Sequence, residues 1–421
     1  MLETDSIRVL AIRSAGRIGL LLPLFAFACV AGDSGSPAIV QRDSAGIAIV
    51  ENEIGNGSTA TCTIDAEPTV TIGETGGAPE YELYRVFGAG RLGDGRIVLV
   101  NQGSQEIRFY DAHGVFLHRA GRAGEGPGEF RDAFQMWVLP GDTVWVGDYR
   151  PWQFQIFGPD GDWVRTVRPR PEYINPPAVM AVLHDGHSLL GDRTHPTGNG
   201  DFELLRVPVV LHGPDGTQVD TLGTYPHGRW GQVDDDPRSI ITYPLFESFL
   251  SVGGSGNRIA IGHASEPSVS LHELQDGEVK LTRIVRWTTG DRAVSSHHID
   301  AARRAAAERG EGLGPEERRL FVDPLVSPDR PVADRFPAFS ALHVGRDGRL
   351  WVREYARPDA ADAGRRWIVF DTDGALQCTA LMPEIDRILE LGTDYVLALQ
   401  RDELDVERVV NLGVISPTGG Q

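Results

Sequence analysis

Several positions along the chain carry polar side chains directly after a short apolar run, and these side chains are of types that bind ligands. The set, in chain order, is Asn101, Asp148 with Arg150, Asp192, His263, Arg353 with Glu354 and Tyr355, and Arg401. If such carboxylates, imidazoles and guanidinium groups converge, they could hold a metal ion, a sugar or a peptide. Ordinary solvated strand ends carry the same residue types, so this second interpretation stays open.

No recognised catalytic motif accompanies these residues. The chain has no Gly-x-Ser-x-Gly elbow, no GxGxxG that opens a helix after a strand, and no Walker loop. Its histidines in loops and in the insertion show no metal-ligand spacing; they are His195, His227, His263, His297 and His298. We therefore predict no catalytic residue and no cofactor, and leave a divalent cation near the candidate residues as an open alternative.

The elements that must position these residues are copies of one pattern, in which short apolar strands alternate with Asp-Gly-type turns. The turn residues Gly95, Gly141 and Gly186 lie 46 and 45 residues apart. This spacing is typical of a four-stranded propeller blade of roughly 40–50 residues. One copy alone leaves both apolar faces of its sheet exposed, so the copies must stack on one another. We predict an all-β six-bladed β-propeller of four-stranded antiparallel blades over residues 45–416.

The sixth copy lacks its last strand. The strand-like run 67–73 lies ahead of the first copy and is expected to close the ring from the N-terminal side, with 45–51 assigned to the same edge. Residues 289–336 interrupt the repeat between the fourth and fifth blades, and their alanine-rich segment 299–309 predicts a partly helical insertion. Its role, a binding loop or a surface excursion, stays open. A short tail, 417–421, follows the propeller.

The N-terminal segment 1–29 is typical of an export signal. Basic residues precede an apolar run over 18–30, which is shorter than the roughly 20 residues needed to span a bilayer. The run contains Cys29, which predicts lipidation after cleavage, with simple secretion as the alternative. Residues 30–44 are expected to form a flexible tether.

Two cysteines, Cys62 and Cys378, remain after the signal segment. In an exported protein this even pair could form a disulfide, while two buried free thiols are the other interpretation.

The net charge of −19, from 40 basic and 59 acidic residues, argues against a nucleic-acid surface and an anionic-membrane surface, because both need clustered cations. Membrane contact is expected only through the N-terminal lipid anchor. We expect a monomer whose partner is a protein, a peptide or a small molecule.

The glycine-proline run Gly124-Glu-Gly-Pro-Gly-Glu-Phe130, with the strand 94–100 before it, resembles NHL-type repeats. The whole layout, over roughly residues 45–415, is similar to exported bacterial six-bladed β-propeller lipoproteins. The resemblance implies a fold that hosts sensors, scaffolds, hydrolases and lyases, with ligands at the mouth of a central channel. We expect a binding module of the cell envelope without its own catalysis, anchored on the periplasmic or outer-membrane face, or secreted. The alternative is a metal-dependent lactonase-type or lyase-type enzyme with its site at the channel mouth.

Overall fold

The computed structural model describes residues 39–54, 59–150, 152–173, 177–191, 201–234, 236, 238–358, 360 and 364–416. The predictions on Cys29, on Asp192, and on the segments 1–29 and 417–421 lie outside the described residues, as does most of the expected tether.

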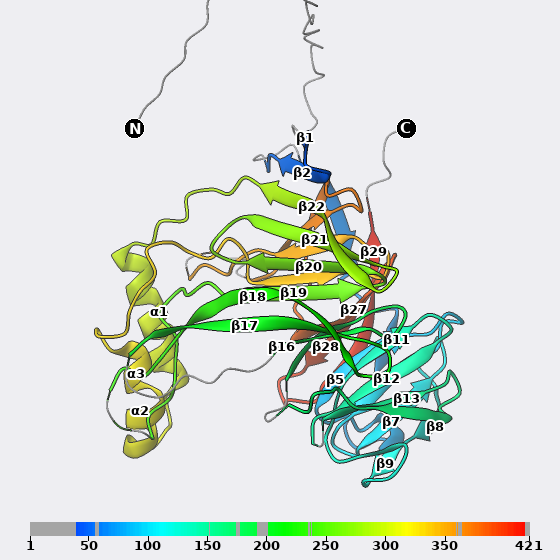
Figure 1. Ribbon diagram of the computed structural model, residues 1–421. Helices are drawn as coiled ribbons and strands as arrows, with labels where there is room; N and C mark the ends of the chain where they lie inside the picture. Colours follow the sequence, from blue (N-terminus) through cyan, green and yellow to red (C-terminus); the bar gives the residue numbers. More distant parts are fainter. Residues whose placement is uncertain are drawn as a thin grey trace, which may run out of the picture. The chain divides into compact units, whose positions relative to one another are not determined.

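The described residues are mostly β-strand, arranged in antiparallel sheets of four consecutive strands (Figure 1). Each sheet is named here by its first strand. The β5 sheet contains β5 (Val86–Arg91), β6 (Ile97–Asn101), β7 (Glu106–Tyr110) and β8 (Phe116–Ala120). The β11 sheet contains β11 (Ala133–Leu139), β12 (Thr143–Asp148), β13 (Gln153–Phe157) and β14 (Trp163–Val167). The β15 sheet contains β15 (Ala178–Val182), β16 (Ser188–Gly191), β17 (Glu203–His212) and β18 (Gln218–Trp230).

The second half of the chain repeats this order. The β19 sheet contains β19 (Leu250–Ser255), β20 (Arg258–His263), β21 (Ser268–Gln275) and β22 (Glu278–Trp287). The β23 sheet contains β23 (Ala341–Val344), β24 (Leu350–Arg353), β25 (Arg366–Phe370) and β26 (Leu376–Leu381). The β27 sheet contains β27 (Arg387–Leu391), β28 (Tyr395–Arg401) and β29 (Glu407–Ile415), and its fourth strand is β4 (Val70–Ile72). Shorter elements are the parallel pair β9 (Arg122–Ala123) and β10 (Glu129–Phe130), and the 3-10 turn η1 (Pro79–Tyr81).

Asp-Gly turns make the sheets possible, because a tight hairpin needs a positive φ that glycine adopts without strain. Gly95 and Gly186 have φ values of 92° and 90°. Gly186 is also required by packing, since a Cβ at this position would lie 2.9 Å from the Trp145 ring of the preceding sheet.

Buried hydrophobic clusters join each sheet to the next along the chain and join the β27 sheet back to the β5 sheet. In the closing cluster, for example, Leu397 of β28 packs with Leu99 of β6 and Ile72 of β4. Because both apolar faces of every sheet are covered in this way, the sheets stack in a closed cycle. This is the arrangement of a β-propeller.

The N-terminal strands attach to three different sheets. The pairing of β4 with β29 confirms the prediction that residues 67–73 complete the last sheet. The prediction for 45–51 was wrong, because β2 (Ile47–Asn52) runs parallel to β22, with β1 (Ile39–Ser44) outside it. The backbone pairing with β22 holds β2 there, and the buried Asn52 amide adds hydrogen bonds to the carbonyl oxygens of Arg286 and Gly374.

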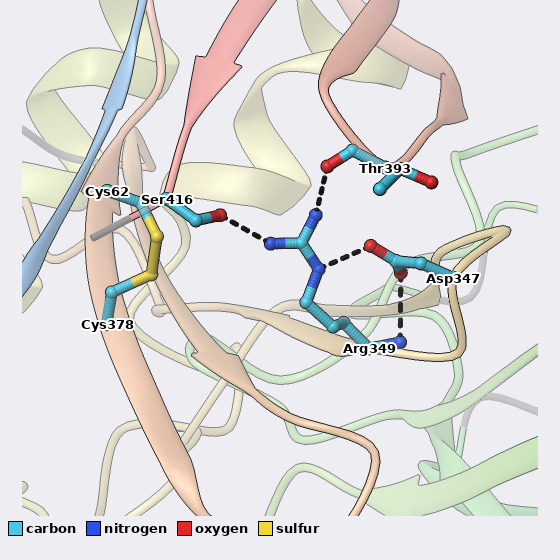
Figure 2. Close-up of a disulfide and its surroundings, with 6 residues drawn as sticks. All are labelled: Cys62, Asp347, Arg349, Cys378, Thr393 and Ser416. Atoms are coloured by element: carbon cyan, nitrogen blue, oxygen red, sulfur yellow. Dashed lines mark hydrogen bonds and ion pairs between the residues drawn. A yellow bond between two sulfur atoms is a disulfide. The ribbon is translucent and has the colours of Figure 1, made fainter. Parts of the chain in front are cut away.

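Strand β3 (Thr61–Ile64) lies between β26 and β29 and carries a disulfide. Cys62 is bonded to Cys378 of β26, with the two Cα atoms 5.6 Å apart and both residues buried (Figure 2). Nearby, Arg349 donates to Asp347, to the Thr393 carbonyl and to the Ser416 hydroxyl. The bond links residues 316 apart in sequence, and a crosslink over so long a loop stabilises a fold by about 2–5 kcal/mol.

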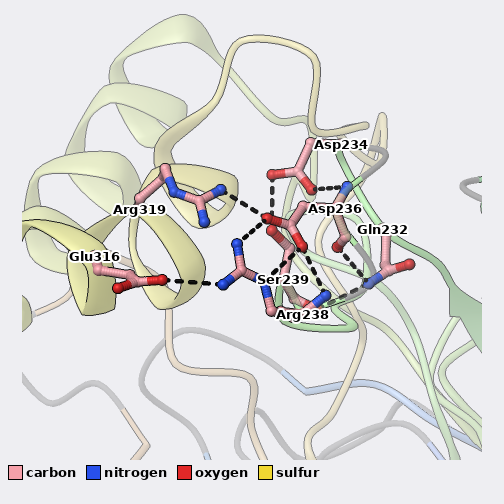
Figure 3. A network of polar contacts seen from close by, with 7 residues as sticks. All are labelled: Gln232, Asp234, Asp236, Arg238, Ser239, Glu316 and Arg319. Carbon is pink, nitrogen blue, oxygen red and sulfur yellow. Dashed lines mark hydrogen bonds and ion pairs between the residues drawn. The ribbon is translucent and has the colours of Figure 1, made fainter.

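Residues 289–336 contain α1 (Ser296–Arg309), α2 (Pro315–Phe321) and α3 (Asp323–Val326), which lie beside the ends of the long strands β17 and β18 (Figure 1). Polar contacts tie α2 to the segment after β18 (Figure 3). The Asp236 carboxylate accepts hydrogen bonds from Arg238 and Arg319, and Arg238 also donates to Glu316. Such exposed ion pairs contribute little. A buried cluster of Leu245, Phe246 and Phe336 provides the stronger attachment.

Candidate functional site

The first strands of the sheets line one central cavity of about 1100 Å³. Residues of β5, β11, β15, β19, β23 and β27 form its wall, and Leu205, Val207, His227 and Trp230 of the long β17–β18 pair contribute to it. Most of the lining side chains are apolar. A cavity that combines apolar walls with polar groups at particular positions is typical of a small-molecule site.

One end of the cavity has cations stacked on aromatic rings. Phe87 lies near the start of β5, and the guanidinium carbon of Arg387, at the start of β27, is 4.7 Å from its ring centroid. Arg85 approaches the same ring at 5.7 Å. Phe134 of β11 lies 4.6 Å away, and both phenyl rings line the cavity. We call Arg85, Phe87, Phe134 and Arg387 the rim cluster.

No carboxylate of the described residues forms an ion pair with Arg85 or Arg387. Burial, and then the positive charge of Arg401, lower the pKa of Arg387. Arginine nevertheless stays protonated in proteins. The rim cluster therefore presents two charged guanidinium groups whose charge is not neutralised by direct contact.

At the opposite ends of β5 and β27 lies the Glu390 carboxylate, which has several hydrogen-bond and ion-pair partners. The Glu390 carboxylate accepts hydrogen bonds from the Tyr395 hydroxyl at 2.5 Å and the Arg91 amide at 2.9 Å. Arg346 lies 3.6 Å from its other oxygen and donates to the Arg91 carbonyl. Burial raises the pKa of Glu390. We call Arg91, Arg346, Glu390 and Tyr395 the floor cluster.

Imidazole and indole groups also line the cavity: His343 of β23, and His227 and Trp230 of β18. Burial, followed by the charge of Arg353, lowers the pKa of His343 to about 4, so this ring is neutral at pH 7. Burial also lowers the pKa of His227. His227 Nδ1 and Trp230 Nε1 have no hydrogen-bond partner among the described groups. These three groups thus offer neutral polar atoms to the cavity.

The described members of the set predicted from the sequence do not line this cavity. Three of them support the backbone at strand ends. Asn101 accepts from the Tyr84 amide, and Asp148, whose pKa is raised by burial, accepts from the Asp132 amide. Arg401 binds Glu407 at 2.8 Å, and Glu407 in turn accepts from the Val86 amide.

The other predicted residues have separate partners. Arg150 is exposed and lies 3.7 Å from Asp132, while Glu354 pairs with Arg366 at 3.0 Å. The Nδ1 atom of His263 is 2.8 Å from the Ser265 hydroxyl, and burial lowers the pKa of the His263 ring.

Two predicted neighbours, Arg353 and Tyr355, are also held by local contacts. Arg353 donates to the Gly364 carbonyl at 2.6 Å. Tyr355 packs 5.8 Å from Phe336, and burial raises its pKa to about 12. Among the described residues, the members of the predicted set thus have separate local partners.

The sequence pattern did not point to Arg387, Glu390, Phe87 and His343, because the predicted candidates all follow the second strand of a copy. These residues lie in first strands. A signal was present: β27 reads Arg-Ile-Leu-Glu-Leu, which places two charges in a strand whose faces should be apolar.

Among the described residues, no three His, Cys, Asp or Glu side chains gather as a metal-binding group. None of the helices in the described part of the chain has the length and apolarity needed to span a bilayer.

No protein-family model matches the chain, and no curated protein matches it in sequence. Solved structures do resemble it. A predicted exported protein from Bacteroides fragilis is 12% identical with a TM-score of 0.46, over 88% of this chain and 100% of that one. A gluconolactonase from Xanthomonas campestris is 12% identical with a TM-score of 0.40, over 85% and 98%. A calcium-binding regucalcin from Agrobacterium tumefaciens is 9% identical with a TM-score of 0.37, over 86% and 99%. At these values we base no argument about activity on the resemblance.

Proposed function

We propose that the chain is an exported, lipid-anchored six-bladed β-propeller, with NHL-like repeats, that binds a small ligand and has no catalysis of its own. The sheets that begin with β5, β11, β15, β19, β23 and β27 would be its blades. The ligand would have an apolar body, which the cavity walls cover, and an anionic group, which the rim cluster holds.

The observation that carries this proposal is the position of Arg387 above the Phe87 ring at one end of a largely apolar cavity. The ring fixes the plane of the guanidinium group, which then presents paired donors to a carboxylate, sulfonate or phosphate. Apolar walls strengthen such an interaction because they exclude water. Since neither Arg387 nor Arg85 has an ion-pair partner among the described residues, a ligand would not have to displace one.

An anionic aromatic probe, anilinonaphthalene sulfonate, tests the ligand class by its fluorescence on the folded protein. We expect the Arg387→Gln variant to bind it about tenfold more weakly or worse, because a charge-assisted hydrogen bond contributes about 1.5–3 kcal/mol. The matched control is Arg165→Gln: Arg165 also stacks on an aromatic ring, 5.5 Å from Trp145, but does not line the cavity. The uncharged phenylnaphthylamine should bind wild type and Arg387→Gln alike. Equal affinity of both proteins for the sulfonate would overturn the proposal.

The signal-like segment before Cys29 supports the anchor. Cells expressing the full chain and given a radiolabelled fatty acid should yield a labelled protein, and Cys29→Ser should abolish the label. A labelled Cys29→Ser variant, or an unlabelled wild type that is cleaved and released, would show that the chain is not anchored through this residue.

The alternative, a metal-dependent lactonase-type or lyase-type enzyme, has no ligand set among the described residues from which its site could be proposed. Elemental analysis of the purified mature protein tests it directly. If the protein contains one bound divalent cation per chain, the metal-dependent enzyme becomes the better proposal and the binding module is abandoned.

A further inference from the structure

A second, smaller cavity of about 300 Å³ lies beside β14, the outermost strand of the β11 sheet. Two segments form its wall: the turn between β9 and β10, and β14 with the residue that follows it. The residues on which the argument rests are Glu125, Gly126, Pro127, Trp163, Thr166 and Arg168. None of them lines the central cavity. We call this second cavity the outer groove.

The side chain of Trp163 is exposed in the outer groove but held in one orientation. It is 41% exposed, and its Nε1 atom donates to the Gln155 Oε1 atom at 2.9 Å. The same oxygen accepts from the Thr166 hydroxyl at 2.8 Å, and Gln155 Nε2 donates to the Glu129 carbonyl at 3.2 Å. Gln155 is only 1% exposed, so the bonds of a buried amide all go to the groups around the groove. A single exposed apolar residue requires no explanation, whereas a fixed indole inside a groove is a preformed contact surface.

The glycine-proline run 124–130 supplies the other part of the wall, and its turn is also fixed. The Glu129 carboxylate accepts from the Gly126 amide at 2.9 Å, and the Glu129 amide donates back to the Gly126 carbonyl at 3.0 Å. Gly128 has a φ of 72°, and a Cβ at this position would lie 3.2 Å from the Trp163 Cβ atom. Glycine is therefore required for the turn to lie against the tryptophan.

Hydrogen-bonding groups of both charges lie beside the indole. The Arg168 side chain is exposed and makes no hydrogen bond or ion pair with another described residue. Glu125 is also exposed, and its carboxylate pairs with Arg131. A guanidinium group has five donors and a carboxylate can accept several hydrogen bonds, so both groups have positions open to a ligand. The outer groove thus combines a fixed aromatic ring with accessible donors and acceptors.

We propose that the outer groove binds a pyranose ring of a glycan. A sugar ring has an apolar face of C–H groups, which packs against an aromatic ring, and hydroxyl groups at its edge, which need donors and acceptors. Charged side chains form the stronger hydrogen bonds to such hydroxyl groups. A cavity of about 300 Å³ is at the small end of ligand sites and suits one ring of a longer chain. The proposal does not rest on the function proposed for the central cavity.

A proline-rich peptide is the other ligand class that packs on exposed tryptophans. Such peptides dock in grooves lined by several aromatic side chains. Trp163 is the one aromatic side chain among the described residues that line the outer groove. Its N–H group, which would otherwise donate to a peptide carbonyl, is already bonded to Gln155. The ring and the charged groups beside it therefore favour the sugar.

Calorimetric titration of the folded protein with cellohexaose, chitohexaose and hexagalacturonate tests the groove. We expect at least one of the three to bind, and Trp163→Ala to weaken that binding about tenfold or worse, because the stacking surface is lost. Trp163→Phe should retain part of the affinity, since a ring remains. The matched control is Phe321→Ala on α2, an aromatic residue of similar exposure outside the groove, which should bind as wild type does.

A second variant separates ligand binding from folding, because Trp163→Ala also removes the bond to Gln155. Arg168→Gln removes no contact with another described residue, so it should unfold as wild type does and bind the sugar about tenfold more weakly. Arg304→Gln, an exposed arginine of α1, is its control. Arg387→Gln should leave the sugar affinity unchanged, which separates the outer groove from the central cavity.

The same titration with a hexaproline peptide decides between the two ligand classes. Wild type should not bind the peptide through Trp163. The proposal would be overturned if wild type bound none of the three sugars, if Trp163→Ala and Arg168→Gln bound them as well as wild type does, or if only hexaproline showed Trp163-dependent binding.

Discussion

The two ends of the central cavity contain the same kinds of residue, arginines next to aromatic rings, in opposite electrostatic states. In the floor cluster, Arg346 faces Glu390, and the carboxylate also accepts from Tyr395 and from the Arg91 amide. In the rim cluster, Arg85 and Arg387 stack on Phe87 and face no carboxylate of the described residues. The same strands, β5 and β27, supply residues to both clusters.

This difference in bonding separates charged groups that stabilise the fold from charged groups that remain available to a ligand. A charge bonded on all sides, such as Glu390, links its neighbours and has little left to offer a ligand. A charge that only stacks on a ring still has free donors. The comparison predicts that substitutions in the floor cluster change stability, and that substitutions in the rim cluster change binding.

The largest expected effect is that of Glu390→Leu. This variant leaves the Tyr395 hydroxyl and the Arg91 amide without their acceptor and Arg346 without its partner, so we expect a loss of about 3–5 kcal/mol in the free energy of unfolding. Denaturant unfolding measures it. The control is Glu354→Leu, which removes an exposed pair with Arg366 and should cost less than about 1 kcal/mol. Similar losses in both variants would remove the distinction between the floor cluster and a surface ion pair.

The sheets could be predicted because their signals are local. A Gly95 or Gly186 at a hairpin and a few apolar residues on each side determine the strands within one copy. The placement of residues 47–52 could not be predicted in this way. It depends on parallel pairing with β22 and on Asn52, whose amide donates to residues 234 and 322 positions away in sequence. Contacts at this separation leave no pattern in a single sequence.

The residues of the rim and floor clusters were also hard to predict, because their contacts join parts of the chain that are far apart in sequence. The charged residues of β27 could be noticed, but their roles could not be assigned from the sequence. Arg387 and Glu390 are three residues apart, and one stacks on Phe87 while the other bonds the Arg91 amide, 299 positions away. Only the packing of β27 beside β5 shows which charge is bonded and which is not.

A middle-sized effect is expected from His343, which lies in the cavity wall. Its pKa is lowered from 6.5 to about 4 in the folded protein, so the unfolded chain takes up a proton first as the pH falls. The wild type should lose up to about 3 kcal/mol of stability between pH 6.5 and pH 4 through this group. Replacement by glutamine, His343→Gln, should flatten that part of the curve.

Unfolding free energies measured at several pH values give the slopes. The control is His113→Gln, in which an exposed turn residue is replaced and the slope should stay as in wild type. A His343→Gln slope equal to that of wild type would mean that the cavity wall accepts the imidazolium ion, and that the middle of the cavity is as polar as its rim.

The smallest effect on stability is expected at the rim cluster. A small effect here, beside a large one at Glu390, gives the clearest test of the difference between the two clusters. Arg387→Gln removes a partly buried charge that has no ion-pair partner among the described residues, so the lost stacking on Phe87 is offset by the relieved desolvation. The free energy of unfolding should change by less than about 1 kcal/mol, in either direction. Arg85→Gln, the second arginine on the same ring, should behave alike. If either variant is as destabilised as Glu390→Leu, the rim arginines are part of the structural framework and are not held available for a ligand.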